Sequence, residues 1–298
     1  ISCKSQLEKY VSLFKYFDLL SAHALPDMYL AYLVKQKYGI PFINTWHGSD
    51  INIWPFVCKK GFETTKLLMV NADYNFFVSK RLQQTSDKIA KTNNKSHLYT
   101  GPSNIFYKRS ISDKEKLREE LNIQSKYLIG YIGNLVHEKN ILCLPDIFRT
   151  VNAFVDGVYF IVVGDGKLED KLKKRMDKKG VKNVTYTGKV EPERIPSIMS
   201  ALDILLLPSI NEGMPRIALE ALVSGVHVVG SDVGGIPEAI GEENTFALNG
   251  DFVKNISNRI IEILINKEEP KELASEFSWD KAVEKELKVY AEILNKKR

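Results

Sequence analysis

The chain has 298 residues, 44% of them hydrophobic, which is enough for two domains with ordinary buried cores. This composition excludes intrinsic disorder, collagen and coiled coil. The 42 lysines and arginines and 37 aspartates and glutamates are spread along the chain, so the net charge of +5 demands no nucleic-acid partner.

Short apolar runs rich in β-formers alternate with longer amphipathic runs, which is typical of parallel strands joined by helical crossovers. The first hundred residues predict strands at 19–24, 41–47, 75–79 and 97–101, with helices at 27–38 and 62–71. The chain is therefore predicted to be α/β. Four strands make only part of a doubly wound sheet.

Glycine, proline, serine and asparagine near residue 101 break both periods, so residues 101–112 are predicted to connect two domains. The second domain is predicted to have strands at 127–135, 158–164, 184–188, 204–208 and 226–231. Helices are predicted at 141–154, 168–179, 253–266 and 279–296, the second a charged surface helix and the last capped by Ser278. The expected division is 1–105, 106–277 and a final helix, 278–298, that returns to the first domain.

Two glutamates flank the start of a further predicted helix. Pro215 marks its beginning, because proline has no N–H to leave unpaired there, and Gly225 marks its end. A helix that begins just after a strand offers free N–H groups and a positive dipole end to a phosphate at the carboxyl edge of the sheet. Glu212 and Glu220 are predicted to bracket one elongated ligand, with Glu220 accepting from paired hydroxyls such as those of a ribose. The alternative is that both are solvated surface charges, although Glu220 stands among small apolar residues and needs a partner.

Two further candidate sites follow predicted strands. Gly133 permits close backbone approach to a ligand, and Lys139 offers a compact cation for a diphosphate, or is simply a surface lysine. The glycine spacing here is not that of the dinucleotide-binding fingerprint. His47 ends its strand and either faces the crevice at the sheet edge or caps a glycine turn; His23 ends an earlier strand.

The sequence predicts no metal site. Cys3, Cys58 and Cys143 lack paired spacing, which argues against a disulfide framework and a zinc site and favours a reducing cytoplasm. No Asp-x-Asp pair and no phosphate loop ending in Gly-Lys-Ser/Thr occurs, so a bound diphosphate would be stabilised by protein groups. No apolar run approaches the roughly 18 residues that span a bilayer, so the chain is predicted to be soluble.

Together these motifs resemble the retaining glycosyltransferases of family 4, which have the GT-B architecture of two Rossmann-like domains facing across a cleft. The closest motif match is to transferases that make teichuronic, capsular or O-antigen polysaccharides. The resemblance spans nearly the whole chain. It rests on His-Gly-Ser-Asp at 47–50, Gly133 through Lys139, Val-Gly-Asp-Gly at 163–166, Gly-Lys-Val at 188–190, Glu212 through Glu220, Asp-Val-Gly-Gly-Ile-Pro-Glu at 232–238 and Phe-Ser-Trp at 277–279.

The resemblance implies that the second domain binds the donor and the first domain binds the acceptor. Glu220 would hold the nucleotide ribose, and backbone near Val190 would hold the base. Lys139 would hold the diphosphate, with Gly133 and Asn134 beside it.

For catalysis, the resemblance implies that Glu212 and the N–H groups around Met214 and Arg216 contact the donor sugar and its β-phosphate. His47 would face the reacting sugar. The leaving diphosphate would be stabilised electrostatically, with no metal or other cofactor, and the anomeric configuration would be retained by same-face attack.

The chain departs from the family pattern at several places. Asn134 stands where relatives commonly have arginine, which removes one positive charge from the diphosphate site, and Pro215 stands where many have glycine. The usual Asn-Gly-Val-Asp at the domain junction is Thr-Gly-Pro-Ser at 100–103. Relatives have a glycine-rich loop and further elements before the segment that matches residues 19–23, so the first domain is expected to be incomplete.

The resulting hypothesis is a bacterial cytoplasmic hexosyltransferase that uses a UDP- or GDP-sugar and a glycan or lipid-linked acceptor. Basic residues such as Lys59, Lys60, Lys80 and Arg81 suggest peripheral contact with the inner face of the plasma membrane. Two alternatives stay open: a sugar-nucleotide 2-epimerase of the same fold, which needs no acceptor, and a degenerate protein that binds the nucleotide sugar without turnover.

Overall fold

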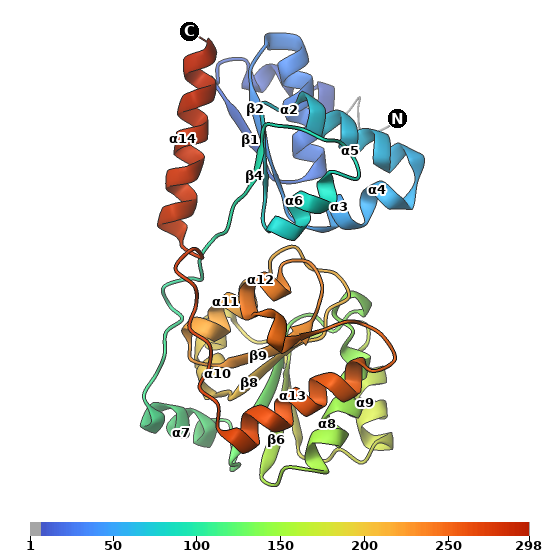
Figure 1. Ribbon diagram of the computed structural model, residues 1–298, viewed down its shortest axis with the longest axis vertical. Helices are drawn as coiled ribbons and strands as arrows, with labels where there is room; N and C mark the ends of the chain where they lie inside the picture. The colour runs from blue at the N-terminus through green and yellow to red at the C-terminus, as the bar shows by residue number, and fades with distance from the viewer. Residues whose placement is uncertain (1–6, 298) are drawn as a thin grey trace. The chain divides into compact units, whose positions relative to one another are not determined.

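The computed structural model describes residues 7–297, and the chain divides into two compact units (Figure 1). One unit comprises Ile1–Thr100 and Glu276–Arg298, and the other comprises Gly101–Ser275. Each unit contains a parallel β-sheet with helices packed on it, which confirms the predicted α/β class.

The sheet of the first unit has four parallel strands in the order β1-β2-β3-β4. These are β1 (Leu20–Ala22), β2 (Phe42–Trp46), β3 (Tyr74–Phe77) and β4 (Lys95–His97). The helices of this unit are η1 (Val11–Phe14), α2 (Leu25–Tyr38), α3 (Ser49–Asn52), α4 (Trp54–Val57), α5 (Lys59–Asn71), α6 (Lys80–Ser86) and α14 (Trp279–Lys297). The first three predicted strands and the predicted helices of this unit are confirmed to within a few residues at their ends.

The fourth strand was predicted too late in the chain, at 97–101. β4 ends at His97, and its three residues, Lys-Ser-His, have no apolar pattern. The ammonium of Lys95 pairs with Asp87 at 2.5 Å. Leu98 and Tyr99, which lie within the predicted range, are buried just beyond the end of β4. The ring of Tyr99 packs against Phe277, with ring centroids 4.7 Å apart.

Strand β2 is buried on both faces because helices cover both sides of the sheet. Phe42 and Trp46 belong to the core shared with Met28 of α2 and Leu68 of α5. Ile43, on the opposite face, belongs to a second core that includes residues of α14. Successive side chains of β2 thus point to opposite faces of the sheet, as the two-residue period of a strand requires.

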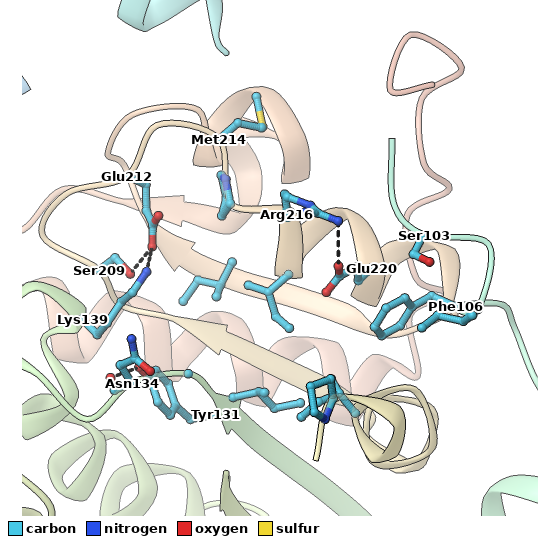
Figure 2. Close-up of a pocket in the computed structure, with 18 residues that line it drawn as sticks. Ser103, Phe106, Tyr131, Asn134, Lys139, Ser209, Glu212, Met214, Arg216 and Glu220 are labelled. Carbon is cyan, nitrogen blue, oxygen red and sulfur yellow. Dashed lines mark hydrogen bonds and ion pairs between the residues drawn. The ribbon is translucent and has the colours of Figure 1, made fainter. Parts of the chain in front are cut away.

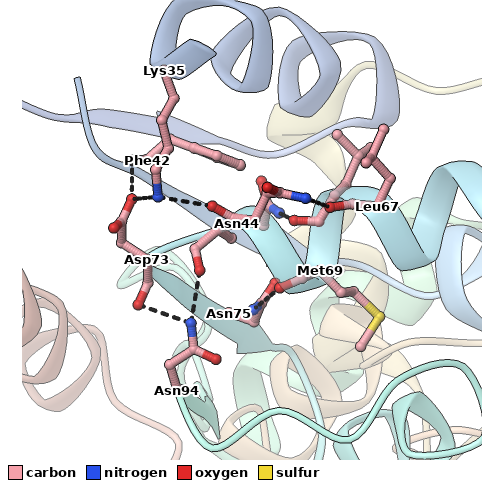
Figure 3. Close-up of polar contacts among 11 residues, drawn as sticks. Lys35, Phe42, Asn44, Leu67, Met69, Asp73, Asn75 and Asn94 are labelled. Carbon is pink, nitrogen blue, oxygen red and sulfur yellow. Dashed lines mark hydrogen bonds and ion pairs between the residues drawn. The ribbon is translucent and has the colours of Figure 1, made fainter. Parts of the chain in front are cut away.

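A buried polar network joins the strands and helices of the first unit (Figure 3). The carboxylate of Asp73 accepts from the ammonium of Lys35 at 2.7 Å and from the backbone N–H of Phe42 at 2.9 Å. The side chain of Asn75, fully buried on β3, accepts from Nε1 of Trp46 at 2.9 Å and donates to the carbonyl of Met69 at 3.0 Å. Lys35 and Asp73 are partly exposed, whereas Asn75 is fully buried and tolerates burial because its amide is hydrogen-bonded.

We expect Asn75→Leu to lower the free energy of unfolding of the first unit by about 3 kcal/mol, because two buried groups lose their partners. Trp46, Trp54 and Trp279 all lie in this unit, so tryptophan fluorescence during urea unfolding reports on it alone. Asn93→Leu, at an exposed position, is the matched control and should change stability by less than about 0.5 kcal/mol. Equal effects of the two substitutions would contradict the role assigned to the network.

The sheet of the second unit has six parallel strands in the order β10-β9-β8-β5-β6-β7. These are β5 (Tyr127–Ile132), β6 (Val158–Val163), β7 (Val184–Gly188), β8 (Ile204–Leu207), β9 (His227–Ser231) and β10 (Thr245–Phe246). The helices are α7 (Ile111–Glu120), η2 (His137–Lys139), η3 (Ile141–Cys143), α8 (Leu144–Asn152), α9 (Glu169–Lys178), η4 (Pro192–Arg194), α10 (Ile195–Ala201), α11 (Arg216–Val223), α12 (Ile236–Ile240), η5 (Glu242–Asn244) and α13 (Phe252–Asn266). The five strands predicted here are confirmed, and the two-residue β10 was not predicted.

The core of the second unit lies between its sheet and helices α8 and α13 (Figure 1). Phe148 of α8 stacks on Phe160 of β6 with ring centroids 3.9 Å apart. Helix α9 buries only Leu172 and Met176, which confirms the predicted surface helix. The helix predicted at 141–154 is a short 3-10 turn followed by α8, because Pro145 fits only the first turn of a helix.

Two further sequence predictions can be compared with the described residues. Cys58 and Cys143 are free thiols, and Cys3 lies outside the described residues. Within residues 7–297, every helix is too short or too polar to cross a bilayer.

Candidate functional site

The strand order of the second unit reverses between β5 and β8. These strands are paired neighbours, with Ile129 opposite Ile204, yet the chain continues from β5 to β6 on one side and from β8 to β9 on the other. In an open parallel sheet, ligands bind outside the carboxyl ends of the strands at such a reversal. A cavity of about 560 Å³ lies there, lined by the ends of β5 and β8, the loops that follow them and the first turns of α11 (Figure 2).

Seven of the nine predicted site residues line this cavity: Gly133, Asn134, Lys139, Glu212, Met214, Arg216 and Glu220. Val190 is not among the lining residues, although Pro192 and Ile195 just beyond it are. His47 belongs to the first unit and lines a different cavity. The structure therefore gathers the predicted donor-binding residues, with the exception of Val190, in one cavity.

Lys139 and Glu212 form an ion pair at one part of the cavity. The ammonium lies 2.5 Å from Oε1 of Glu212, to which the hydroxyl of Ser209 also donates at 2.8 Å. The Glu212 side chain is only 13% exposed, whereas that of Lys139 is 31% exposed. The lysine can therefore meet a ligand phosphate while it still neutralises the glutamate, and Ser209 helps to hold the carboxylate in place.

Glu220 lies in another part of the cavity, one helical turn beyond Arg216 (Figure 2). Its carboxylate is 4.0 Å from the guanidinium of Arg216, which is 58% exposed, while Glu220 itself is 13% exposed. Burial raises the pKa of Glu220, and the charge of Arg216 partly opposes this rise. Arg216 is thus the charged partner of Glu220 among its apolar neighbours. Their separation of 4.0 Å is at the upper limit for an ion pair.

Pro215 is placed slightly differently from the prediction. Helix α11 begins at Arg216, and Pro215 precedes it in an extended conformation, with its carbonyl accepting from the N–H of Ala218 at 2.9 Å. Gly225 lies just past the end of the helix, as predicted, and has a positive φ of 72°. Arg216 and Ile217, in the first turn of α11, line the cavity, so the positive end of the helix dipole lies beside it.

Sequence reasoning missed two polar residues and an aromatic wall of the cavity. The Tyr131 hydroxyl donates to the carbonyl of Asn134 at 2.9 Å, and burial together with the charge of Glu212 raises the pKa of Tyr131, so it stays a neutral donor. Ser209 and Phe106 were also missed. The available signal for Tyr131 was its position two residues before Gly133, because residues two apart on a strand lie on the same face of the sheet.

Glycines hold the backbone of the site in place. A Cβ on Gly164, which has a φ of 122°, would overlap the carbonyl oxygen of Gly133. A Cβ on Gly234, with a φ of 53°, would overlap the carbonyl oxygen of Glu212. The loops that carry Gly133 and Glu212 therefore pack directly against Gly164 and Gly234. A residue with a side chain would not fit at either glycine.

The cavity that His47 lines is formed within the first unit and has a volume of about 540 Å³. The carboxylate of Asp50 accepts from the backbone N–H groups of His47 and Gly48, at 3.0 and 2.8 Å. Partial burial lowers the pKa of His47, while Asp50 opposes this shift. Within residues 7–297, no cluster of three or more His, Cys, Asp or Glu side chains could hold a metal ion.

Comparison with known protein families adds a family match. A sequence model described as "Glycosyl transferases group 1" matches residues 113–277, a range that includes every predicted site residue of the second unit. The putative teichuronic acid biosynthesis glycosyltransferase TuaC of Bacillus subtilis is 31% identical over 229 residues. That alignment covers 76% of this chain and 56% of TuaC, so the chain spans little more than half of that relative's length.

Solved structures share the fold over nearly the whole chain. Anabaena HepE in complex with UDP superposes with a TM-score of 0.78 at 20% identity, covering 98% of this chain and 81% of HepE. Sucrose-phosphate synthase from Thermosynechococcus elongatus gives a TM-score of 0.81 at 18% identity, covering 98% of this chain and 79% of the synthase. HepE has also been solved with UDP-glucose. These likenesses confirm the predicted GT-B class of fold.

Proposed function

The chain belongs to the group 1 glycosyl transferases, and we propose that it transfers a hexosyl unit from a nucleotide diphosphate sugar to a cell-surface glycan or a lipid-linked acceptor. One observation carries this proposal. A single cavity at the reversal of strand order in the second unit gathers two cations and two half-buried carboxylates, all within the range that the family model matches. A nucleotide diphosphate sugar offers complementary groups: phosphate anions for the cations and sugar hydroxyls for the carboxylates.

In the proposed complex, Glu220 accepts from the ribose hydroxyls, and each such charge-assisted bond contributes about 1.5 to 3 kcal/mol. The apolar lining near Phe106 and Ile195, rather than the backbone of Val190 alone, is suited to contact the base. UDP is the first nucleotide to test, because it is bound by HepE, which shares the fold.

In the proposed complex, Lys139 contacts the diphosphate and Glu212 contacts the donor sugar. As the bond between sugar and diphosphate breaks, negative charge grows on the leaving phosphate, and Lys139 with the N–H groups at the start of α11 stabilises it. We propose that no metal takes part and that the acceptor attacks on the face from which the diphosphate leaves, so that the anomeric configuration is retained. His47 of the first unit is proposed to face the reacting sugar.

The membrane contact proposed here is made by the segment from Ile53 to Lys60 of the first unit. Ile53, Trp54, Phe56 and Val57 are 40%, 43%, 53% and 66% exposed, and two exposed lysines, Lys59 and Lys60, follow them. Exposed aromatic and aliphatic side chains beside lysines favour the interface of an anionic bilayer. Ile53 and Trp54 also line the cavity of His47, which would place a lipid-linked acceptor near that residue.

We expect Trp54→Ser/Phe56→Ser to weaken binding to phosphatidylglycerol vesicles about tenfold, because about 1 kcal/mol or more of apolar transfer energy is lost. Co-sedimentation at low and high salt measures the binding. Val70→Ser is the matched control, because Val70 is 56% exposed on α5, outside the segment. If the double variant bound as the parent chain does, membrane contact through this segment would be excluded.

Calorimetric titration with UDP, GDP and their hexose conjugates, without divalent metal, tests the donor site. Release of the nucleotide diphosphate when an acceptor is added, and the anomer of the product by NMR, test transfer and retention. Conversion of the donor alone would instead show an epimerase, which the comparisons with transferases do not favour. Binding without turnover under any acceptor would support the degenerate protein, and no binding of any nucleotide would overturn the proposal.

A further inference from the structure

The first unit carries a pair of histidines in direct contact. His23 follows β1 and His47 follows β2, and because these strands are parallel neighbours, both imidazoles emerge at the same edge of the sheet. Nδ1 of His23 lies 3.2 Å from Nε2 of His47, with the rings tilted by 34°. Both line the cavity of about 540 Å³, whose other walls include Leu25 and Trp54.

The backbone at His47 is fixed independently of its ring. Asp50, only 8% exposed, accepts from the N–H groups of His47 and Gly48 and so fixes the turn that follows β2. Neither bond touches the imidazole. The imidazole itself is in hydrogen-bond contact with the side chain of His23.

The contact continues from His23 to the last helix. Nε2 of His23 lies 3.4 Å from the hydroxyl of Ser21, to which the hydroxyl of Tyr290 on α14 donates at 3.4 Å. The Tyr290 hydroxyl is also 3.4 Å from the carboxylate of Glu286. His23 is thus held on both ring nitrogens, by His47 on one side and by Ser21 on the other.

These contacts allow two proton arrangements, because the single hydroxyl proton of Tyr290 can be donated to Ser21 or to Glu286. When Tyr290 donates to Ser21, the hydroxyl proton of Ser21 is directed to Nε2 of His23. The neutral His23 ring then carries its proton on Nδ1 and donates it to Nε2 of His47. In this arrangement His47 carries its own proton on Nδ1. When Tyr290 donates to Glu286 instead, Ser21 can accept from Nε2 of His23, and both rings take the opposite tautomer.

We propose that His23 is a positioning residue for His47, holding its imidazole in one orientation and in the Nδ1–H tautomer at the cavity wall. This inference rests on the proposed function for its catalytic meaning, because His47 is proposed there to face the reacting sugar. The tautomer leaves Nδ1–H as the donor that His47 can offer a ligand. To donate a hydrogen bond to a reacting sugar, the imidazole must be held in place with its proton on the nitrogen that faces the sugar.

Charge around the pair supports a neutral His47. Partial burial is the largest cause that lowers its pKa, the carboxylate of Asp50 raises it, and the positive charge of a protonated His23 lowers it. Of the groups on α14, the Tyr290 hydroxyl contacts Ser21, and the Glu286 carboxylate contacts Tyr290. A proton on both rings would set two N–H groups against each other, so the pair resists double protonation.

The test compares two replacements of His23 in the full chain. His23→Asn keeps an amide donor close to the position of Nδ1 without a titratable ring, and His23→Phe keeps a ring without a donor. Long-range nitrogen–proton NMR of the histidine side chains reads tautomer and protonation directly. The chain has five histidines, and His47→Gln identifies the signal of His47.

We expect His47 to be the Nδ1–H tautomer in the parent chain and in His23→Asn, and to become a mixture of tautomers in His23→Phe. The pKa of His47 should rise in His23→Phe, because His23 lowers that pKa and its N–H no longer stabilises the neutral His47 ring. An unchanged tautomer and an unchanged pKa of His47 in His23→Phe would overturn the proposal.

Kinetics supply a second readout once a donor and an acceptor are known. In His23→Phe, kcat should fall about tenfold, with KM within about twofold, and its acid limb should move to higher pH as the pKa of His47 rises. His23→Asn should recover most of kcat. If no donor is turned over, the proposed function fails while the NMR result still decides the role of His23.

Discussion

Replacing Lys139 by alanine is expected to lower kcat/KM for the donor about 100- to 1000-fold, the usual effect of removing one preorganised electrostatic contact to developing charge. The ammonium of Lys139 is 2.5 Å from Glu212 and is the more exposed member of the pair. Without it, Glu212 loses the ammonium that pairs with its carboxylate, and repulsion between that carboxylate and the leaving diphosphate increases. Initial rates of nucleotide release at varied donor concentration measure the effect.

Two controls separate this electrostatic loss from a folding defect. Lys182→Ala removes an exposed lysine of the same unit and should change kcat/KM less than twofold. Lys139→Ala/Glu212→Gln removes both charges, so it should restore any lost stability without restoring the rate. A rate for Lys139→Ala equal to that of Lys182→Ala would show that Lys139 does not contact the diphosphate.

Most strands, and several of the residues that line the cavity of the second unit, could be predicted from the sequence for one physical reason. Strands buried on both faces, such as β6, read as continuous apolar runs, and the residues that follow them must meet at the carboxyl edge of a parallel sheet. The position of β4 was predicted wrongly because this strand is polar. Its first residue, Lys95, forms an ion pair and does not pack in an apolar core. The strand order was not predictable from one sequence, since it depends on pairing between distant segments.

The contacts inside the cavity could not be predicted in the same way. Lys139 and Glu212 are 73 residues apart in the chain, and nothing in either local pattern says that their side chains meet. The alternation along β5 could have pointed to Tyr131, but its bond to the carbonyl of Asn134 depends on the turn made by Gly133. Likewise, His23 and His47 each read as a histidine at a strand end, and only the pairing of β1 with β2 brings them together.

Glu220→Gln is expected to weaken the binding of UDP about 10- to 100-fold, which corresponds to a loss of about 1.5 to 3 kcal/mol for a charge-assisted hydrogen bond. The amide can still accept one hydrogen bond but lacks the charge, and its size is unchanged, so the fold should be preserved. Calorimetry at neutral pH measures the affinity. Glu120→Gln, at an exposed position on α7, is the matched control and should bind UDP as the parent chain does.

The same carboxylate predicts a pH dependence with a definite sign. Burial raises the pKa of Glu220, so as the pH falls the carboxylate takes up its proton at a higher pH than an ordinary glutamate, and UDP affinity declines there. Because the charge of Arg216 opposes that shift, Arg216→Ala should move the decline to still higher pH. Glu220→Gln should lose this dependence altogether. A decline that persists in Glu220→Gln at the same pH would assign it to another group and remove the ribose role from Glu220.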